Sequence, residues 1–167
     1  YFSYANRLID VNQALEVGSN LAFNGDFENG STNWGMYNGF AAINGTADLW
    51  YQGGGGNWAN SNYALLLQDM DALVPGNRYR ITLDANVVSG SVKFLDSYSS
   101  LADIVLLIDS TGSYTADFTA ASDLLCFVAD SVSFADLSLD NITVFEIIND
   151  NAINTDDTYG SCSECIQ

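Results

Sequence analysis

Residues 78–88 alternate apolar and polar side chains, and this alternation is the clearest structural pattern in the chain. The apolar positions are Tyr79, Ile81, Leu83, Ala85 and Val87. A period of two is typical of a β-strand with one buried face and one solvent face. Short apolar runs bounded by turn residues predict further strands at 64–69, 91–95, 103–108, 113–118, 124–129 and 134–147.

Turn residues separate these runs at regular intervals. Pro75 lies in a turn before the strand at 78–88, where it removes no hydrogen-bond donor from the sheet. Tight turns are also favoured by four Asn-Gly pairs, which begin at residues 24, 29, 38 and 44. Short strands with no helical pattern between them predict an all-β fold, an antiparallel jelly-roll β-sandwich of roughly eight to ten strands over residues 20–147.

The two ends of the chain have different patterns. Leu8, Val11 and Leu15 have helical spacing, with Ser3 as an N-cap and Gly18 as a stop, so we predict a short N-terminal helix within residues 4–17. Its apolar stripe is too narrow to build a domain alone. We therefore interpret residues 1–19 as a helical attachment segment, 20–148 as the module and 149–167 as a polar tail. Both ends are expected to contact protein neighbours.

The charge balance excludes some classes of partner. The chain has 167 residues, which suits a single domain, with 4 Lys+Arg against 21 Asp+Glu and a formal net charge of -17. Nucleic acid is excluded because its binding needs cations that neutralise phosphates, and anionic membranes are disfavoured for the same reason. No run approaches the roughly 18 apolar residues of a membrane-spanning helix. Cations and neutral molecules remain as suitable partners.

Histidine is absent, which removes the usual nucleophile pairs and the commonest general base, so we expect no enzyme activity. A pair of carboxylates for glycoside hydrolysis is conceivable, but no pair stands out. Cys126 lies in an apolar run and is interpreted as a buried, inert thiol. Cys162 and Cys165 form a C-x-x-C pair in the tail, where a local or interchain disulfide or no role at all fits better than zinc.

Two phrases of the sequence resemble a known family. Asn20-Leu-Ala-Phe-Asn-Gly-Asp-Phe-Glu28, followed by Trp34, resembles the opening strand of the family 4/9/22 group of carbohydrate-binding modules. Residues 114–144 resemble the last three strands of these modules, which close on a phrase like Leu139-Asp140-Asn141-Ile142. The resemblance covers residues 20–147, although the middle of this range matches only in the spacing of its strands and turns. It implies a jelly roll that binds glycans and has no catalytic residues.

Modules of this group typically hold a structural calcium ion where the first and last strands meet. By position, the resemblance implies Glu28 and Asp140 as metal ligands together with backbone carbonyls, and Asp26 as a weaker candidate. Calcium prefers several hard oxygen ligands, which suits a chain rich in carboxylates. The alternative is that Glu28 is solvated and Asp140-Asn141 only shapes a bulge.

The segment 48–63 concentrates the side chains that recognise sugars. Aromatic rings stack on the C–H faces of sugars, and planar polar groups bind hydroxyls. Four glycines at 53–56 favour an exposed loop. The predicted contacts for a glycan or a partner are Trp50, Tyr51, Trp58 and Tyr63, with Gln52, Asn57 and Asn60 supplying orientation. Alternatively, some of these rings face the core, which we favour for Trp34 and Trp50 but not for Trp58.

The sequence thus favours an extracellular module that binds a neutral polysaccharide or surface glycan. Neutral glycans are preferred because an acidic protein repels anionic ones. The alternative function is a structural phage virion protein, such as a tail, fibre or capsid decoration subunit, acting in assembly or in adhesion to the host surface. A secreted module is expected to be monomeric, whereas a virion subunit is expected to form a symmetric assembly.

Overall fold

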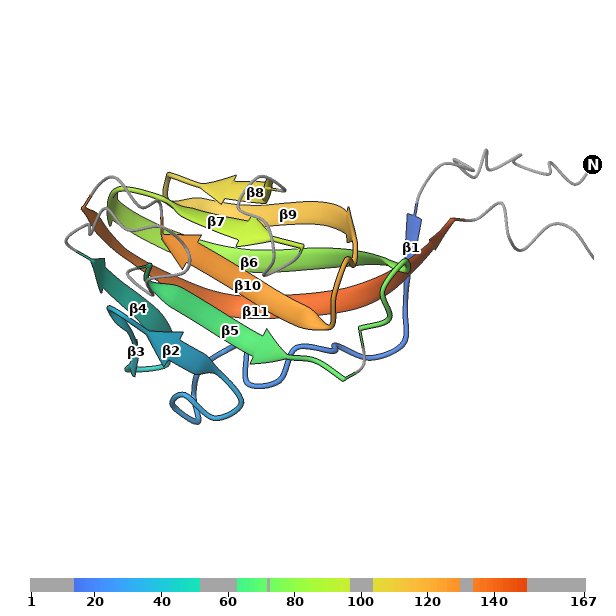
Figure 1. The fold of residues 1–167 in the computed structure, drawn as a ribbon, viewed down its shortest axis with the longest axis horizontal. Helices are drawn as coiled ribbons and strands as arrows, with labels where there is room; N and C mark the ends of the chain where they lie inside the picture. The colour runs from blue at the N-terminus through green and yellow to red at the C-terminus, as the bar shows by residue number, and fades with distance from the viewer. Residues whose placement is uncertain (1–13, 52–62, 72, 97–103, 130–133, 150–167) are drawn as a thin grey trace, which may run out of the picture.

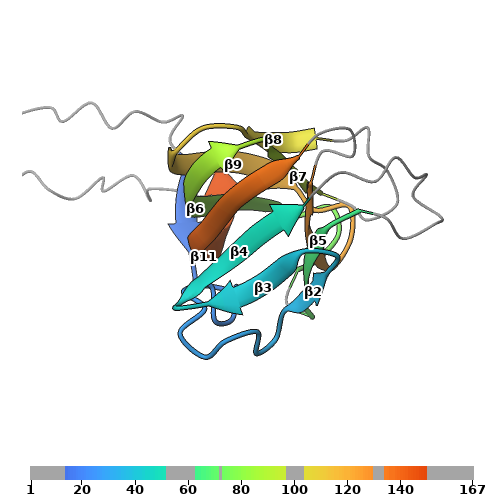
Figure 2. The same ribbon diagram turned by 90° about the vertical axis from the view of Figure 1, so that its left-hand side faces the viewer.

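The computed structural model describes residues 14–51, 63–71, 73–96, 104–129 and 134–149, which form two antiparallel β-sheets packed face to face (Figures 1 and 2). The six-stranded sheet has the order β3 (Phe40–Ile43), β4 (Thr46–Tyr51), β11 (Ala135–Asn149), β6 (Arg78–Ser89) and β9 (Gly112–Thr119), and β1 (Ala14–Val17) pairs with β11. The five-stranded sheet has the order β2 (Gly35–Tyr37), β5 (Leu65–Asp69), β10 (Leu124–Ala129), β7 (Val92–Leu95) and β8 (Ile104–Ile108). The predicted β-sandwich is confirmed.

The core lies between the sheets and is made by the inward positions of alternating strands. In β6, Tyr79, Ile81 and Leu83 are buried while the polar residues between them face outward. Phe94 packs on Phe127 with ring centroids 5.1 Å apart. Burying one such large apolar side chain stabilises the fold by about 1.5–3 kcal/mol. Trp34 is also buried, as expected from the sequence.

Two of the four predicted Asn-Gly turns join strands of the structure directly. Asn38-Gly39 links β2 to β3, and Asn44-Gly45 links β3 to β4. All four residues have positive φ, and Asn44-Gly45 forms the tight hairpin turn between the paired strands β3 and β4 that an Asn-Gly pair favours. A side chain at Gly39 would meet the backbone oxygen of Trp50 at 2.6 Å, so only glycine allows β4 to approach this turn.

The predicted N-terminal helix is wrong for the part of it that the structure describes. Residues 14–17 form β1, in which Leu15 is paired with Ile148 of β11. A short helix with a narrow apolar stripe is marginal in water, whereas β11 offers a continuous row of backbone partners. Residues 1–13 lie outside the described ranges. Among the described residues, no helix has the length and apolar character needed to cross a membrane.

The opening phrase of the resemblance folds as a series of turns, although a strand was expected there. The turns are fixed to β11 by hydrogen bonds from the Leu21 amide to Val144 O, 2.8 Å, and from the Ile142 amide to Gly25 O, 2.9 Å. The side chain of Gln68, fully buried, accepts from the amide of Phe23 and donates to its carbonyl. Leaving such a buried group without a partner would cost about 1–3 kcal/mol. The segment therefore closes one edge of the sandwich.

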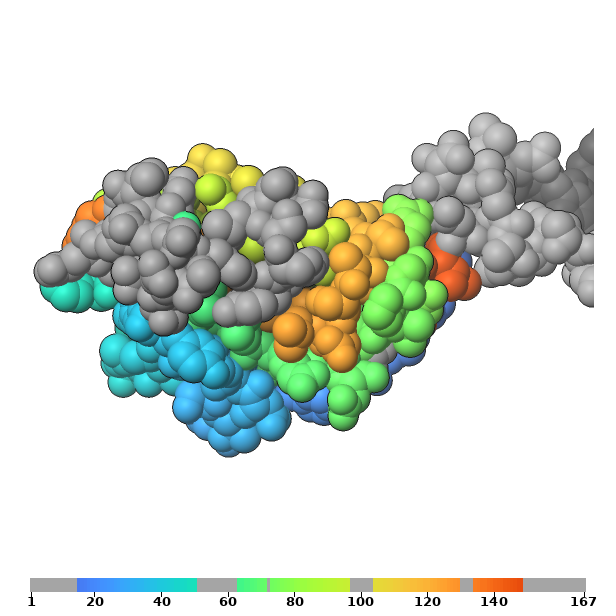
Figure 3. All heavy atoms as spheres, in the orientation of Figure 1, coloured from blue at the N-terminus to red at the C-terminus, as the bar shows by residue number. Residues whose placement is uncertain are grey.

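The central strand of the five-stranded sheet, β10, is apolar on both faces. In β10, Leu125 and Phe127 belong to the main core, while Cys126 and Val128 point to the other side. There they join a second buried cluster, which we call the outer cluster and which contains Tyr63, Leu65, Leu95, Cys126 and Val128. Cys126 is buried, as predicted, and this burial raises the pKa of its thiol to about 12. Figure 3 shows this side of the molecule, with β5 beside β10.

Candidate functional site

The structure separates Trp50 from Tyr63, two of the aromatic residues that the sequence grouped into one platform. Trp50 is 57% exposed on the six-stranded sheet, so the expectation that it packs in the core is wrong. Tyr63 is 7% exposed and belongs to the outer cluster of the other sheet, so its predicted role as an exposed contact is wrong as well. The other predicted contacts, the side chain of Tyr51 and residues Gln52, Asn57, Trp58 and Asn60, lie outside the described residues.

Trp50 points outward because of the alternation along β4. Ala47 and Leu49 are buried in the core, which places Asp48 and Trp50 on the opposite face of the strand. β4 is paired on one side with β3 and on the other with β11, where Asp136 lies directly opposite Trp50. The tryptophan therefore stands on a strand whose backbone is hydrogen-bonded on both sides.

A hollow of about 270 Å³ adjoins this ring on the outer face of the sheet, and we call it the Trp50 hollow. Its floor comes from β4, β11 and β6. It is lined by Ile43, Asp48, Leu49, Trp50, Asn86, Val88, Asp136, Leu137 and Ser138. Phe134 stands edge-on to Trp50, with ring centroids 6.0 Å apart and an interplanar angle of 86°. Ile43, Val88 and Phe134 are themselves exposed.

The lining combines two kinds of chemistry. An exposed indole offers a flat apolar face, and the carboxylates of Asp48 and Asp136 accept hydrogen bonds from hydroxyl or amine groups. Asn86 can donate and accept, and Ser138 adds a hydroxyl. A hollow with an aromatic side and several convergent polar groups can orient a small polar ligand with an apolar face.

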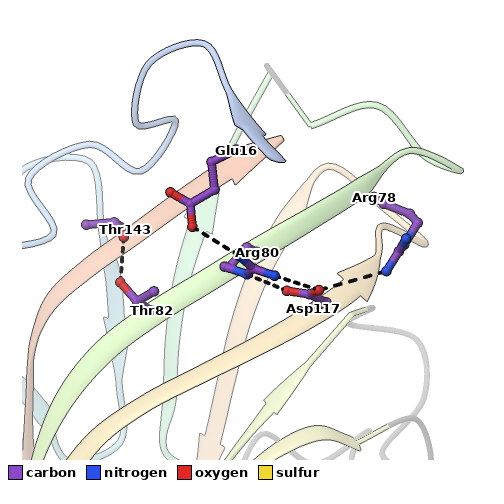
Figure 4. A network of polar contacts seen from close by, with 6 residues as sticks. All are labelled: Glu16, Arg78, Arg80, Thr82, Asp117 and Thr143. Atoms are coloured by element: carbon purple, nitrogen blue, oxygen red, sulfur yellow. Dashed lines mark hydrogen bonds and ion pairs between the residues drawn. The ribbon is translucent and has the colours of Figure 1, made fainter. Parts of the chain in front are cut away.

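Among the described residues, the cationic side chains on this face are Arg78 and Arg80, which lie at its other end. Arg80 makes two hydrogen bonds to Asp117, of 2.7 and 3.0 Å, and an ion pair with Glu16, while Arg78 lies 3.9 Å from Asp117 (Figure 4). The hydrogen bond to Asp117 is the main cause that raises the pKa of Arg80. Along β6, Arg80 and Asn86 are six residues apart, or about 20 Å. At this distance, the two arginines do not neutralise the carboxylates of Asp48 and Asp136 in the Trp50 hollow.

Between these two ends, the face is a set of mutually satisfied polar groups. Thr82 and Thr143 share a hydrogen bond of 2.7 Å between their hydroxyls. Asp84 accepts hydrogen bonds from Ser113 and Asn141, and these two bonds lower the pKa of its carboxyl. The groups have partners within the protein, so the middle of the face offers less to a ligand than the Trp50 hollow does.

The predicted metal ligands are divided between two segments. Glu28 lies in the turn segment, with its carboxylate beside Gly45, and its amide contacts the carboxylate of Asp26. Asp140 lies on β11, where its carboxylate accepts the amide of Asn141 at 2.7 Å. Asn141 has a φ of 52° and the strand register shifts there, so the bulge of the alternative interpretation is present.

Within the described residues, no three side chains of Asp, Glu, His or Cys are grouped as a metal site requires. A calcium ion at this place would therefore need backbone carbonyls or amide oxygens for most of its ligands. The calcium site implied by the resemblance stays a prediction.

A second hollow, of about 500 Å³, lies between the turn segment and β11. Its walls come from residues 20–33 and 141–143, and they include Asp26, one of the predicted metal ligands. Its asparagines are largely used by the fold: Asn20 accepts the amides of Ala22 and Val144, and Asn24 donates to Gly30 O and Thr32 O. We therefore interpret this hollow as a structural crossing of two segments.

The chain resembles known proteins in its fold, whereas comparisons of its sequence find no match. No protein-family model matches the chain, and no curated protein matches it. A solved family 4 carbohydrate-binding module is similar at 16% identity and a TM-score of 0.53, covering 74% of this chain and 98% of that one. A mutant of a family 29 carbohydrate-binding module, studied for its ligand recognition, is similar at 17% identity and a TM-score of 0.50, covering 80% of this chain and 86% of that one. The chain has the β-sandwich fold of carbohydrate-binding modules, as the resemblance in sequence implied.

Proposed function

We propose that this protein is a non-catalytic module that binds glycans through the Trp50 hollow. The observation that carries the proposal is the exposed indole of Trp50, which stands beside hydrogen-bonding side chains on the outer face of a sheet. Trp50 belongs to a group of exposed apolar side chains with Phe134, Ile43 and Val88, and a contiguous exposed apolar patch marks a contact surface. The fold shared with carbohydrate-binding modules supports this proposal without identifying the ligand.

The strand pairing around Trp50 supports tight binding because it reduces the entropy lost when a ligand binds. β4 is fixed on both sides, and the amide of Trp50 also donates to Gly39 O at 3.1 Å. A ring that is already in place loses little freedom on contact with a sugar. Asn86 and Ser138 then orient the hydroxyls of the bound unit.

Charge narrows the class of glycan. The net charge of -17 and the two aspartates of the hollow repel uronic acids and sulfated sugars. Among common polysaccharides, neutral β-glucans, xylans and mannans meet this requirement. We take them as the first candidates for the binding measurement.

The test is the affinity for a panel of soluble polysaccharides, measured by calorimetry for the full chain and two variants. Trp50→Ala is expected to weaken binding by at least about tenfold, since a lost stacking contact removes more than about 1 kcal/mol. Tyr37→Ala is the matched control, because Tyr37 is 51% exposed but lies on β2 of the other sheet. Equal losses in the two variants, or unchanged binding by Trp50→Ala, would contradict the proposal.

The virion hypothesis predicts a different behaviour of the same protein. It depends on an attachment helix and a tail that fall mostly outside the described residues, so it stays a prediction. Light scattering of the purified chain separates the two functions: a symmetric assembly supports a virion subunit, and a monomer that binds glycan supports the module.

A further inference from the structure

Two aromatic rings meet at a right angle beside the Trp50 hollow. Trp50 and Phe134 are 57% and 42% exposed, and their planes differ by 86°. Both rings remain partly exposed to solvent in this edge-on contact. The electron-rich face of an indole attracts cations, and it does so more strongly than the other aromatic rings.

Two carboxylates share this hollow. Asp136 lies directly across the strand pair from Trp50, so the two Cβ atoms are about 5 Å apart. Asp48 lies two residues before Trp50 on the same face of β4 and is held by a hydrogen bond of 2.7 Å from the hydroxyl of Thr46. In the described part of the chain, neither carboxylate forms an ion pair, and no lysine or arginine lines the hollow.

A neutral sugar would use the indole face but would leave both negative charges without a counterion. A ligand that carries a positive charge next to an apolar face satisfies both parts of the lining at once, because the cation meets the carboxylates while the face meets the ring. Charge complementarity therefore selects among the glycans that the proposed function admits.

We propose that the Trp50 hollow prefers glycans with protonated amines, such as polymers of glucosamine, over neutral ones. This proposal rests on the proposed function, since it names the substrate class of the same hollow. The C–H face of the sugar ring stacks on Trp50, and the ammonium group lies between Asp48 and Asp136. The volume of about 270 Å³ suits a single sugar unit more than a longer segment.

The experiment compares three β-1,4-linked tetramers of equal length: glucosamine, N-acetylglucosamine and glucose. Calorimetry is done at mildly acidic pH, so that the amine of glucosamine is protonated. The site variant is Asp48→Asn with Asp136→Asn, which keeps the shape and removes two charges. The control variant is Asp109→Asn with Asp123→Asn, which changes the net charge equally at two exposed positions outside the hollow.

The glucosamine tetramer is expected to bind the unchanged protein at least about tenfold more tightly than the other two tetramers. The site variant should lose this preference, so that it binds the three tetramers about equally, and the control variant should keep the preference. Equal losses in the site and control variants would overturn the proposal, since they indicate attraction to the net charge alone.

Two further outcomes separate this proposal from the one on which it rests. Equal affinities for the three tetramers, lost in Trp50→Ala, would overturn the preference for amines and leave the glycan-binding function in place. No binding of any tetramer, with binding of a lysine-rich peptide that the site variant abolishes, would overturn both and assign the hollow to a protein partner.

Discussion

The two outer faces of this sandwich are built on the same strand geometry but have opposite character. On the six-stranded sheet, the outward positions of β6 hold Arg80, Thr82, Asp84 and Asn86, and the face ends in the Trp50 hollow. On the five-stranded sheet, the outward positions of β10 hold Cys126 and Val128, which are completely buried in the outer cluster. Alternation decides which residues point outward, and only their chemistry decides whether that side is a surface or a second core. Stability and binding are therefore expected to respond to mutations on different sheets.

A pair of valines gives the largest expected contrast. Val128 is 0% exposed on β10, and Val88 is 71% exposed on β6. Val128→Asp should lower the free energy of unfolding by more than about 4 kcal/mol, because it buries a charge without a partner. Val88→Asp should change it by less than about 0.5 kcal/mol. Urea denaturation measures both, and a loss below about 1 kcal/mol for Val128→Asp would show that the outer cluster is open to water. Val128→Ala repeats the comparison with a milder change if the charged variant does not fold.

Calcium would join the two sheets, because the turn segment contacts β11 of one sheet and Gln68 of the other. If Glu28 and Asp140 hold calcium, the ion binds only the folded state and raises the melting temperature, by an amount equivalent to about 2.7 kcal/mol at a hundredfold excess over its Kd. Glu28→Ala should remove the effect of calcium, while Asp109→Ala should keep it. If the unchanged protein has the same melting temperature in calcium and in chelator, the calcium site is contradicted. Asp140 would then only shape the bulge of β11.

Acid should weaken the polar face by a smaller amount. Hydrogen bonds from Ser113 and Asn141 lower the pKa of Asp84 in the folded state. A carboxyl with a lowered pKa contributes stability above its unfolded pKa of about 3.9, and this contribution is lost as the pH falls through the folded pKa. The free energies of unfolding of the unchanged protein and of Asp84→Asn, measured by denaturation at a series of pH values, should therefore converge as the pH falls below about 4. A difference in free energy that stays constant with pH would show that these hydrogen bonds do not favour the ionised form.

The strands from residue 64 onward could be predicted because their apolar positions mark a face that the fold buries. β2 and β3 could not, since they have three and four residues, too few to show a period. Their Asn-Gly turns were visible, and the strands between them were not. β1 was mistaken for a helix because Leu8, Val11 and Leu15 repeat at helical spacing, whereas pairing with β11 decides the conformation of residues 14–17.

For the candidate site, the sequence identified the chemistry but not the place. Trp50 was identified as a contact residue, yet the run Leu49-Trp50-Tyr51 does not say which ring faces the core. Phe134 and Asp136 were missed, because they lie more than 80 residues away and meet Trp50 only through the pairing of β11 with β4. The polar positions between Ala135 and Leu139 were the available signal of an exposed strand face.

The pairing of β1 with the end of β11 has a consequence for engineering. Ala14 and Asn149 are cross-strand partners, so the backbone enters and leaves the sandwich about 5 Å apart. The Trp50 hollow lies near the opposite end of β11, at Asp136 to Ser138, as the course of the strand in Figure 1 shows. Two attachment points this close together are compatible with insertion into a surface loop of another protein, since short linkers suffice to close the gap. A sandwich inserted in this way would present Trp50 on the side that faces away from the host protein.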